Sequence, residues 1–371
     1  MDTNIGAKER VTQNRLIGLF KNVLKYTYLG NWETREDNAN IEEKLLTAYL
    51  SRRGYTDKEI RSSIVKLKQS ANSLGGGLYN ANKEVYTFLR YGVNIQAEVT
   101  EKKKMVHLID WANPMENDFQ IAEEVTIQGA SDRRPDLVVY VNGIALAVIE
   151  LKRSTVSAHE GIRQNIRNQQ DGYIPRFFTT IQLLFAGNDT EGLHYGVIKT
   201  PEKFWLRWKE PCGEPCQPSH FTAKEYPNEL DRSVLQFFEP VRLLEYIHDF
   251  IIFDGGIKKT ARPNQYFAVK AAQPRVRKKQ NGIIWHSQGS GKSLTMVWLA
   301  QWIRENVSDA RVVIITDRDE LDKQIESGFK DVGEQIQRAK SGGKLIEMLN
   351  AAEYIAAAQK YGLEYNNKGY D

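Results

Sequence analysis

Residues 134–152 read RPDLVVYVNGIALAVIELK, and this stretch decides the fold of the first part of the chain. An Asn-Gly dipeptide at 142–143 stands between two apolar runs, which is the strongest short-range signal for a β-hairpin. Successive side chains of a strand point to opposite faces, so Glu150 and Lys152 share one face at the end of the second strand. Asp136 begins the first strand and therefore lies opposite that end. The sequence thus predicts two acids and a lysine side by side.

These three residue types suit the hydrolysis of a phosphodiester. Asp136 and Glu150 repel each other unless a cation lies between them, and hard oxygen ligands suit Mg²⁺. A bound Mg²⁺ can lower the pKa of a water and polarise the phosphodiester, while Lys152 can offset charge that develops on the phosphate. We therefore predict an Mg²⁺-dependent endonuclease, with both acids as metal ligands and all three residues catalytic. The alternative is a strand that ends in ordinary surface charges, because Glu-x-Lys is a common triplet.

A second motif, HSQGSGKS, occupies residues 286–293. An apolar segment at 281–287 leads into it and a helical pattern at 295–306 follows it, which is the strand–loop–helix setting of a phosphate-binding loop. Glycines let backbone N–H groups turn inward around phosphates, the lysine reaches the β- and γ-phosphates, and the last serine binds Mg²⁺. The residues predicted to contact ATP·Mg²⁺ here are Gly289, Ser290, Gly291, Lys292 and Ser293. His286 stands where the usual first glycine would, and a plain Gly-Ser turn before a helix is the alternative.

Other parts of an ATP-driven motor are only partly recognisable. Gln265 precedes the loop by roughly the distance at which motor ATPases place a Gln that reads adenine, and its amide can both donate and accept. A strand at 311–317 would complete a strand–helix–strand unit of a parallel sheet. The acidic pair at 319–320 follows the loop too soon to be the hydrolytic acids, and no better pair occurs before Asp371. We expect the nucleotide-binding half of a motor lobe.

The order of these patterns divides the chain into three parts. Residues 1–208 are predicted to form an α/β domain that contains the hairpin, residues 209–255 a linker and helical connector, and residues 256–371 a partial ATP-binding lobe. The composition between 209 and 228 changes to Pro, Cys, Gly and short polar residues. Helices are predicted at 8–29, 40–53, 57–72, 157–171 and 244–254, and strands at 86–93, 105–111, 119–127, 136–141, 144–151 and 179–187.

Composition excludes some classes of protein. Hydrophobic residues make up 41% of the chain and charged residues 26%, which is too apolar for a disordered protein. No apolar run approaches the roughly 20 residues of a membrane span. The N-terminal residues have no apolar core that could act as a secretory signal, and the chain has only two Cys. We therefore expect a cytoplasmic protein without membrane contact.

Two weaker patterns stay open. The net charge is only +4, yet the segment 255–280 carries eight basic residues and no acid. Clustered Lys and Arg either form a solvated face or contact nucleic-acid phosphates, and composition does not decide between them. Cys212, Cys216 and His220 offer three soft ligands at irregular spacing, whereas structural zinc sites normally have four. Free thiols are the favoured interpretation.

Together these motifs resemble the restriction (motor–nuclease) subunit of type I restriction–modification enzymes. The segments that carry the resemblance follow the order of that family along nearly the whole chain. They are TQNRLIGLFKNVLKYTYLG, NDFQIAEEVTI, RRPDLVVYVNGIALAVIELK, QLLFAGN, NQYFAVKAA, GIIWHSQGSGKS and VVIITDRDELDKQ.

The resemblance implies a PD-(D/E)xK nuclease domain followed by an incomplete RecA-like P-loop domain of the superfamily 2 helicase type. It implies that Asp136, Glu150 and Lys152 cut double-stranded DNA, with Mg²⁺ and ATP as cofactors. The family often carries a Gln-x₃-Tyr pair on the helix after the second strand. Gln164 has the expected place for the Gln, although Asn168 stands where the Tyr would, while Gln169 and Tyr173 satisfy the pattern five residues later.

The family also implies modification (methyltransferase) and specificity subunits as partners, and a longer whole protein in which cleavage is coupled to DNA translocation. Two other hypotheses remain. One is a non-catalytic module that binds DNA or a partner, and the other is a stand-alone ATPase, which the missing hydrolytic acids disfavour.

Overall fold

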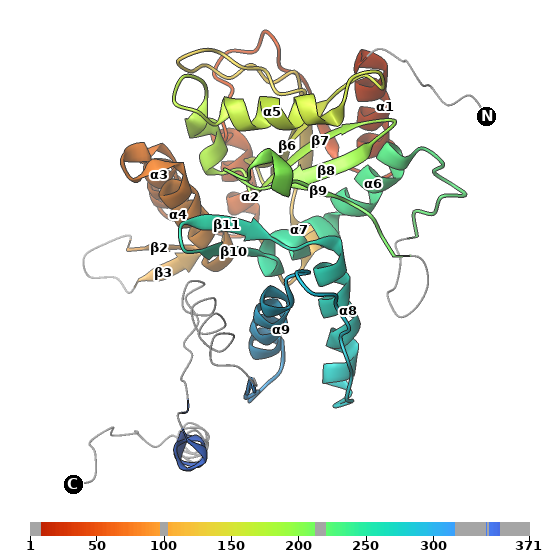
Figure 1. Cartoon of the computed structure of the whole chain (residues 1–371). Helices are drawn as coiled ribbons and strands as arrows, with labels where there is room; N and C mark the ends of the chain where they lie inside the picture. Colours follow the sequence, from red (N-terminus) through yellow and green to blue (C-terminus); the bar gives the residue numbers. More distant parts are fainter. Residues whose placement is uncertain (1–8, 97–102, 212–219, 316–338, 340, 349–371) are drawn as a thin grey trace. The chain divides into compact units, whose positions relative to one another are not determined.

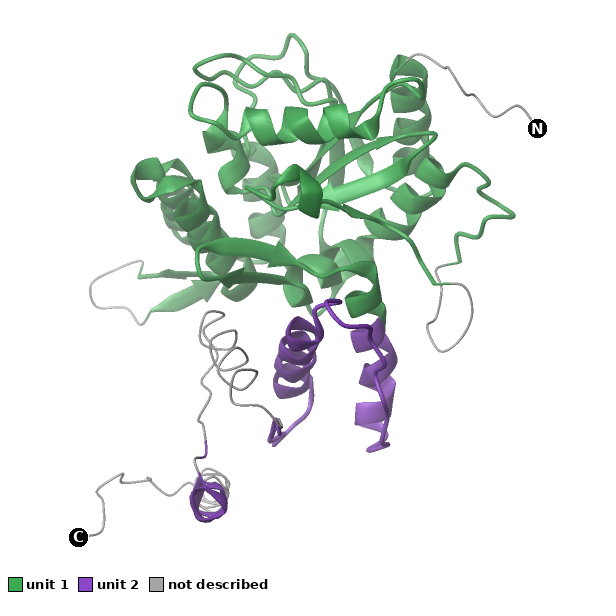
Figure 2. Cartoon of the chain, in the orientation of Figure 1, with its two compact units in different colours: residues 1–267 green, residues 268–371 purple. Residues whose placement is uncertain are grey.

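A computed structural model describes residues 9–96, 103–211, 220–315, 339 and 341–348. The chain divides into two compact units, residues 1–267 and residues 268–371 (Figure 2).

A seven-stranded mixed sheet forms the centre of unit 1 (Figure 1). Its strands, in spatial order, are β1 (Thr27–Asn31), β4 (Phe119–Glu123), β5 (Leu137–Val141), β6 (Ile144–Leu151), β7 (Leu183–Asn188), β8 (Gly192–Gly196) and β9 (Leu206–Arg207). The pairs β1–β4 and β6–β7 are parallel, and the other neighbouring pairs are antiparallel. The predicted α/β class is thereby confirmed for this unit.

The predicted hairpin is confirmed as β5 and β6. Asn142 and Gly143 form its turn with φ angles of 53° and 78°, the positive values that a tight two-residue hairpin turn requires. Leu137 pairs with Ile149, so the residue before β5 lies beside the end of β6. Every residue of both strands is buried. The hairpin therefore lies in the middle of the sheet with both faces covered.

Helices cover the two faces of this sheet, and the alternation of side chains along β7 shows which face each one covers. Ala186 belongs to an apolar cluster with Ile162 of α5 (Ala158–Asn168), and α5 crosses β6 and β7 (Figure 1). The neighbouring Phe185 points the other way and packs on Phe237 and Phe238 of α6 (Glu229–Phe238), with ring centroids 4.9 and 4.6 Å apart. Helix α1 (Glu9–Asn22) contacts α6, β1 and β6.

The predicted helices at 40–53 and 57–72 are confirmed as α2 (Glu43–Arg52) and α3 (Asp57–Asn72). The helix predicted at 244–254 is confirmed only in part, as α7 (Pro240–Asp249), because residues 251–254 form a strand. A further helix, α4 (Gly77–Tyr91), was not predicted. The prediction of a strand at 86–93 was wrong, because Tyr86 to Tyr91 belong to α4. Leu78, Val85 and Leu89 are buried at helical spacing on that helix. Their packing outweighs the tendency of the aromatic residues at 86–91 to form strands. Two short hairpins complete unit 1: β2 (Val93–Ile95) with β3 (Lys104–Val106), and β10 (Ile251–Asp254) with β11 (Ile257–Thr260).

The predicted boundaries differ from the compact units. The segment 209–255 contains α6 and α7, whose aromatic side chains pack on the sheet of unit 1 and so join its core. Trp208 is fully buried, with ring centroids 4.7 Å from Phe237 and 6.0 Å from Tyr246. The described part of the predicted connector is thus part of the first compact unit.

The basic residues at 255–280 do not form one exposed surface. Lys258 on β11 is 3% exposed, and its ammonium donates to Asn82 Oδ1 at 2.8 Å and Gln182 Oε1 at 2.7 Å. Lys259 forms an ion pair with Asp254. Lys258 therefore attaches the β10–β11 hairpin to the rest of unit 1 and is not available to a phosphate.

Unit 2 contains the end of α8 (Pro263–Arg277) and the whole of α9 (Lys292–Asn306), which was predicted. The strands predicted at 281–287 and 311–317 do not form in the described residues, and Ile283, Trp285 and Ile315 are 90, 90 and 89% exposed. A strand needs a neighbouring strand to bond its backbone, and the described part of unit 2 contains no strand. The segment at 319–320 lies outside the described residues. Among the described helices, none has the length and apolarity that a membrane crossing requires.

Candidate functional site

The structure brings Asp136, Glu150 and Lys152 together at one end of the β5–β6 hairpin. Asp136 lies directly before β5, and its Oδ2 accepts a hydrogen bond of 2.6 Å from the backbone N–H of Leu151. The ammonium of Lys152 is 4.0 Å from that same oxygen. The proximity predicted from the two-residue period of strands is therefore found, and the catalytic roles stay a prediction.

Glu150 is more buried than the sequence indicated. Its residue is 0% exposed, and neither carboxylate oxygen has a hydrogen-bond partner. Helix α5 covers it where Gly161 passes, because a Cβ built on that glycine would lie only 3.3 Å from the Glu150 Cβ. The backbone of α5 thus approaches closely at a position where the helix carries no side chain, and it closes one side of the site.

Burial changes the protonation of both acids. Burial raises the pKa of Glu150 well above its ordinary value, and the negative charge of Asp136 raises it further. Burial also raises the pKa of Asp136 to about 6, although the positive charge of Lys152 opposes this. Removal of a carboxylate from water is costly unless a positive charge compensates it.

A divalent cation fits this arrangement. A fully buried carboxylate with both oxygens unpartnered, Glu150, and a partly buried one, Asp136, are oxygen donors of the kind that Mg²⁺ takes in proteins. A cation between them would offset the cost of burying their charges. Asp136 and Glu150 would hold it.

Lys152 completes this group of charges. Burial alone would lower the pKa of its ammonium, but the carboxylates of Asp136, Glu150 and Glu9 outweigh burial and raise it. The ammonium donates to Glu9 Oε1 at 3.0 Å and to the carbonyl of Leu151 at 2.7 Å. Lys152 is therefore held as a cation beside the acidic pair.

The two Gln-x₃-Tyr alternatives now differ in their surroundings. Gln169 donates to the carbonyl of Asn165 at 2.8 Å and accepts from the backbone of Lys199 at 2.7 Å, so its amide joins two parts of the fold. Tyr173 lies under the guanidinium of Arg133, 4.2 Å from the ring centroid. Gln164 is partly exposed on α5, three residues after the glycine that covers Glu150. Which of the two pairs serves the site stays a prediction.

The glycine-rich loop lies in unit 2. Gly289 and Gly291 have φ angles of 76° and 85°, and α9 begins at Lys292 directly after them. The Lys292 ammonium donates to the carbonyls of His286 and Ser287 at 3.2 and 3.1 Å, within the loop itself. Two left-handed glycines before a helix N-terminus give the backbone geometry that can turn N–H groups toward an anion.

Ser290, Ser293 and Gln265 are further residues predicted to contact ATP·Mg²⁺. Ser290 Oγ donates to the carbonyl of Ser287 at 2.7 Å, and Ser293 lies partly exposed on the first turn of α9. Gln265 belongs to unit 1, where it is 2% exposed and its amide oxygen accepts from the backbone N–H of Arg262 at 2.8 Å. The structure thus brings together the loop residues, while the predicted adenine-reading residue lies in the other compact unit.

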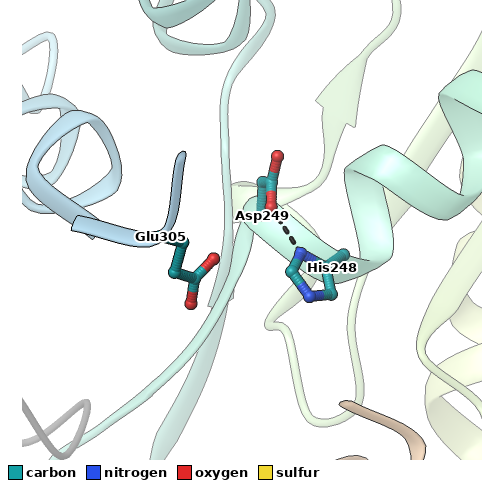
Figure 3. A group of neighbouring side chains, drawn as sticks. All are labelled: His248, Asp249 and Glu305. Atoms are coloured by element: carbon teal, nitrogen blue, oxygen red, sulfur yellow. Dashed lines mark hydrogen bonds and ion pairs between the residues drawn. The ribbon is translucent and has the colours of Figure 1, made fainter. Parts of the chain in front are cut away.

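Two further groups bear on metal binding. Cys212 and Cys216 lie outside the described residues, so the structure does not test whether they bind zinc together with His220. At the end of α7, His248 Nδ1 and Asp249 Oδ1 are 2.5 Å apart (Figure 3). Glu305, also drawn in that figure, belongs to unit 2. One histidine and one carboxylate that already bind each other do not make a metal site.

Sequence reasoning missed Glu9. Its only sequence signal is an acid in the first turn of a helix that was predicted for other reasons. Only the folded chain shows that this turn ends beside Lys152.

In unit 1, the buried Glu150, the partly buried Asp136 and a lysine at the end of a central hairpin form a candidate metal-dependent hydrolytic site, and unit 2 carries a loop of the phosphate-binding kind. Together, these two features indicate a protein that combines a hydrolytic site with a nucleotide-binding loop. Residues 7–203, more than half of the chain, match the family described as the type I restriction enzyme R protein N terminus. The chain belongs to this family. Residues 264–369 match a second family, the SWI2/SNF2 ATPase.

Similar proteins carry names of the same kind. A Methanocaldococcus jannaschii protein, provisionally named type I restriction enzyme MjaIXP endonuclease subunit, is 26% identical over 98% of this chain and 38% of its own length. The type I restriction enzyme HindI endonuclease subunit of Haemophilus influenzae is 27% identical over 80% of this chain and 30% of its own length. The chain thus spans well under half the length of these curated relatives.

Proposed function

We propose that this chain is the nuclease-bearing N-terminal portion of a type I restriction subunit, which cuts double-stranded DNA with Mg²⁺. The observation that carries the proposal is the Glu150 carboxylate, fully buried beside Asp136 with both oxygens unpartnered. A protein keeps such a costly group where a cation compensates it during function. The mixed sheet with its central hairpin and covering helices supports a PD-(D/E)xK domain.

Each side chain of the site would have a separate role in the cleavage reaction. Asp136 and Glu150 would hold Mg²⁺, which supplies an activated water and polarises the phosphodiester. Lys152, kept as an ammonium by its acidic neighbours, would offset the negative charge that develops on the phosphate oxygens. Gln164 on α5 would orient substrate or water from the covering helix. Helix α5 excludes solvent from Glu150, which strengthens these electrostatic interactions.

The test is nicking of supercoiled plasmid by the full chain with Mg²⁺ or with EDTA. We expect nicking with Mg²⁺ only, and a loss of about a hundredfold or more in Lys152→Ala, the range for removing one group that stabilises transition-state charge. Intact plasmid in both proteins, with DNA binding retained in a gel-shift assay, would instead support the non-catalytic binding module. Equal nicking by both proteins would contradict the assignment of Lys152.

A second proposed property is ATP·Mg²⁺ binding by the loop 289–293, with Gln265 as the adenine reader. The left-handed glycines and the match of residues 264–369 to the SWI2/SNF2 ATPase family support it. In the whole protein, this lobe would belong to a RecA-like motor that couples translocation to cleavage, next to modification and specificity subunits.

Replacement of Lys292 by Ala is expected to weaken ATP·Mg²⁺ binding by about tenfold or more, because a charge-assisted hydrogen bond to phosphate is worth roughly 1.5–3 kcal/mol. The exposed Lys292 makes hydrogen bonds only to loop carbonyls, so its loss leaves the packing of α9 intact. Isothermal titration calorimetry with ATP and Mg²⁺ measures the effect. The exposed Lys278→Ala is the matched control, and equal affinity in wild type and K292A would remove the loop from the nucleotide site.

A further inference from the structure

Helix α1 brings a third carboxylate to the candidate nuclease site. Glu9 lies in its first turn, and its Oε1 accepts the Lys152 ammonium at 3.0 Å. The Glu9 side chain is 40% exposed, while that of Lys152 is 14% exposed. The contact therefore joins a partly solvated acid to a largely buried cation, and it connects the first helix of unit 1 to the far end of its central hairpin.

The first turns of α1 are fixed to the same site by a second contact. Gln13, one helical turn after Glu9, donates to the backbone carbonyl of Asp136 at 3.2 Å and to Glu123 Oε2 at 3.1 Å. Residues four apart lie on one face of a helix. Since Gln13 is 2% exposed and hydrogen-bonded on that face, Glu9 is held beside Lys152 by the packing of its helix and not by a long flexible arm.

The charges explain what Glu9 does when a cation is bound. Without a cation, Asp136 and Glu150 both attract the Lys152 ammonium. A divalent cation between these acids would cancel their attraction and repel the ammonium. One carboxylate more restores neutrality to the set of two acids, one ammonium and one divalent cation, and Glu9 is the acid that accepts the Lys152 ammonium.

We propose that Glu9 is a positioning residue, which holds Lys152 in the site while a divalent cation occupies Asp136 and Glu150. It rests on the proposed nuclease function and deepens it. Glu9 acts through Lys152 and is not counted among the metal ligands. Among the residues that the structure describes, the Glu9 carboxylate at 3.0 Å is nearer to the Lys152 ammonium than the Asp136 carboxylate at 4.0 Å, and the buried hydrogen bonds of Gln13 hold α1 in this place.

The test compares Glu9→Gln with wild type in the full chain by two measurements. In plasmid nicking with Mg²⁺, we expect kcat to fall about tenfold with KM for DNA unchanged. In calorimetry with Mn²⁺ and no DNA, we expect binding to weaken by about fivefold to tenfold, because one negative charge near the cation is lost. Glu160→Gln removes an exposed acid that pairs with Arg163 on α5, and it is the control expected to change neither.

Combination with Lys152→Ala separates positioning from a general charge effect. If Glu9 acts through the lysine, Glu9→Gln lowers cleavage no further in the Lys152→Ala background. An additive loss, or Glu9→Gln with wild-type kcat and Mn²⁺ affinity, overturns the role of Glu9 while the nuclease function stands. Absence of both nicking and Mn²⁺ binding in the wild-type chain would contradict both the role of Glu9 and the proposed nuclease function. Circular dichroism verifies that each variant is folded.

Discussion

Replacement of Glu150 by Gln is expected to abolish metal-dependent cleavage and at the same time to make the metal-free chain more stable. Gln keeps the size and shape of the side chain under α5 but cannot supply a carboxylate to a cation. Loss of one of only two acidic ligands should lower kcat by about a thousandfold or more, which corresponds to about 4 kcal/mol of transition-state stabilisation. Plasmid nicking under single-turnover conditions measures it.

The gain in stability follows from the raised pKa values. A carboxyl group whose pKa is higher in the folded than in the unfolded chain binds more protons when folded, so its contribution to stability is lost as pH rises between the two values. For Asp136 that window runs from about 3.8 to about 6, and for Glu150 it begins at 4.5 and extends well above. Wild-type stability without metal should therefore fall as pH rises from 4 to neutral.

Glu150→Gln removes one of these two groups and lowers the repulsion felt by the other. At neutral pH, the free energy of unfolding should be higher than in wild type, because the variant has no buried carboxyl group at this position whose ionisation is disfavoured. Urea denaturation at several pH values in EDTA measures it, with the exposed Glu160→Gln as control. An ordinary structural carboxylate would behave oppositely, because its loss would reduce stability. Lower stability together with retained nicking would show that Glu150 is not a metal ligand.

How far the sequence could predict this site depends on which contacts are local. Asp136, Glu150 and Lys152 lie on one hairpin, so the two-residue period of strands and the turn at 142–143 suffice to bring them together. The burial of Glu150 depends on Gly161 of α5, which is brought over the strand by tertiary packing. Glu9 is more than a hundred residues from Lys152 along the chain, and no local pattern relates them.

The same distinction explains the errors in the fold. Residues 86–91 are rich in aromatic residues and were predicted as strand, but their apolar spacing continues that of the preceding turns of α4. The segment 281–287 has the apolar character of a buried parallel strand, yet a strand needs partners, and its Ile283 and Trp285 are exposed among the described residues. The segment 209–255 was predicted as a linker and helical connector because of its Pro-rich beginning, and its helices carry aromatic residues that cover the sheet.

That covering role leads to the second large effect. A fragment that ends at Trp208, the predicted domain boundary, is expected not to fold, whereas a fragment that ends at Arg277 is expected to fold. The shorter fragment lacks α6 and α7. It therefore exposes one face of the sheet, including Phe185, Tyr195 and Trp208, which are fully buried in the structure.

The size of the effect follows from the aromatic residues that would be lost. Phe237, Phe238 and Tyr246 are fully buried, and ring pairs join Phe237 to Phe185 at 4.9 Å and Tyr246 to Trp208 at 6.0 Å.

Burial of each such side chain contributes about 1.5–3 kcal/mol, and the rings they cover lose burial as well. The total approaches the roughly 5–15 kcal/mol that stabilises a whole domain. Circular dichroism and urea denaturation of the two fragments measure it. A cooperative transition in the fragment that ends at Trp208 would contradict the inclusion of α6 and α7 in the core, and would return the nuclease boundary to residue 208.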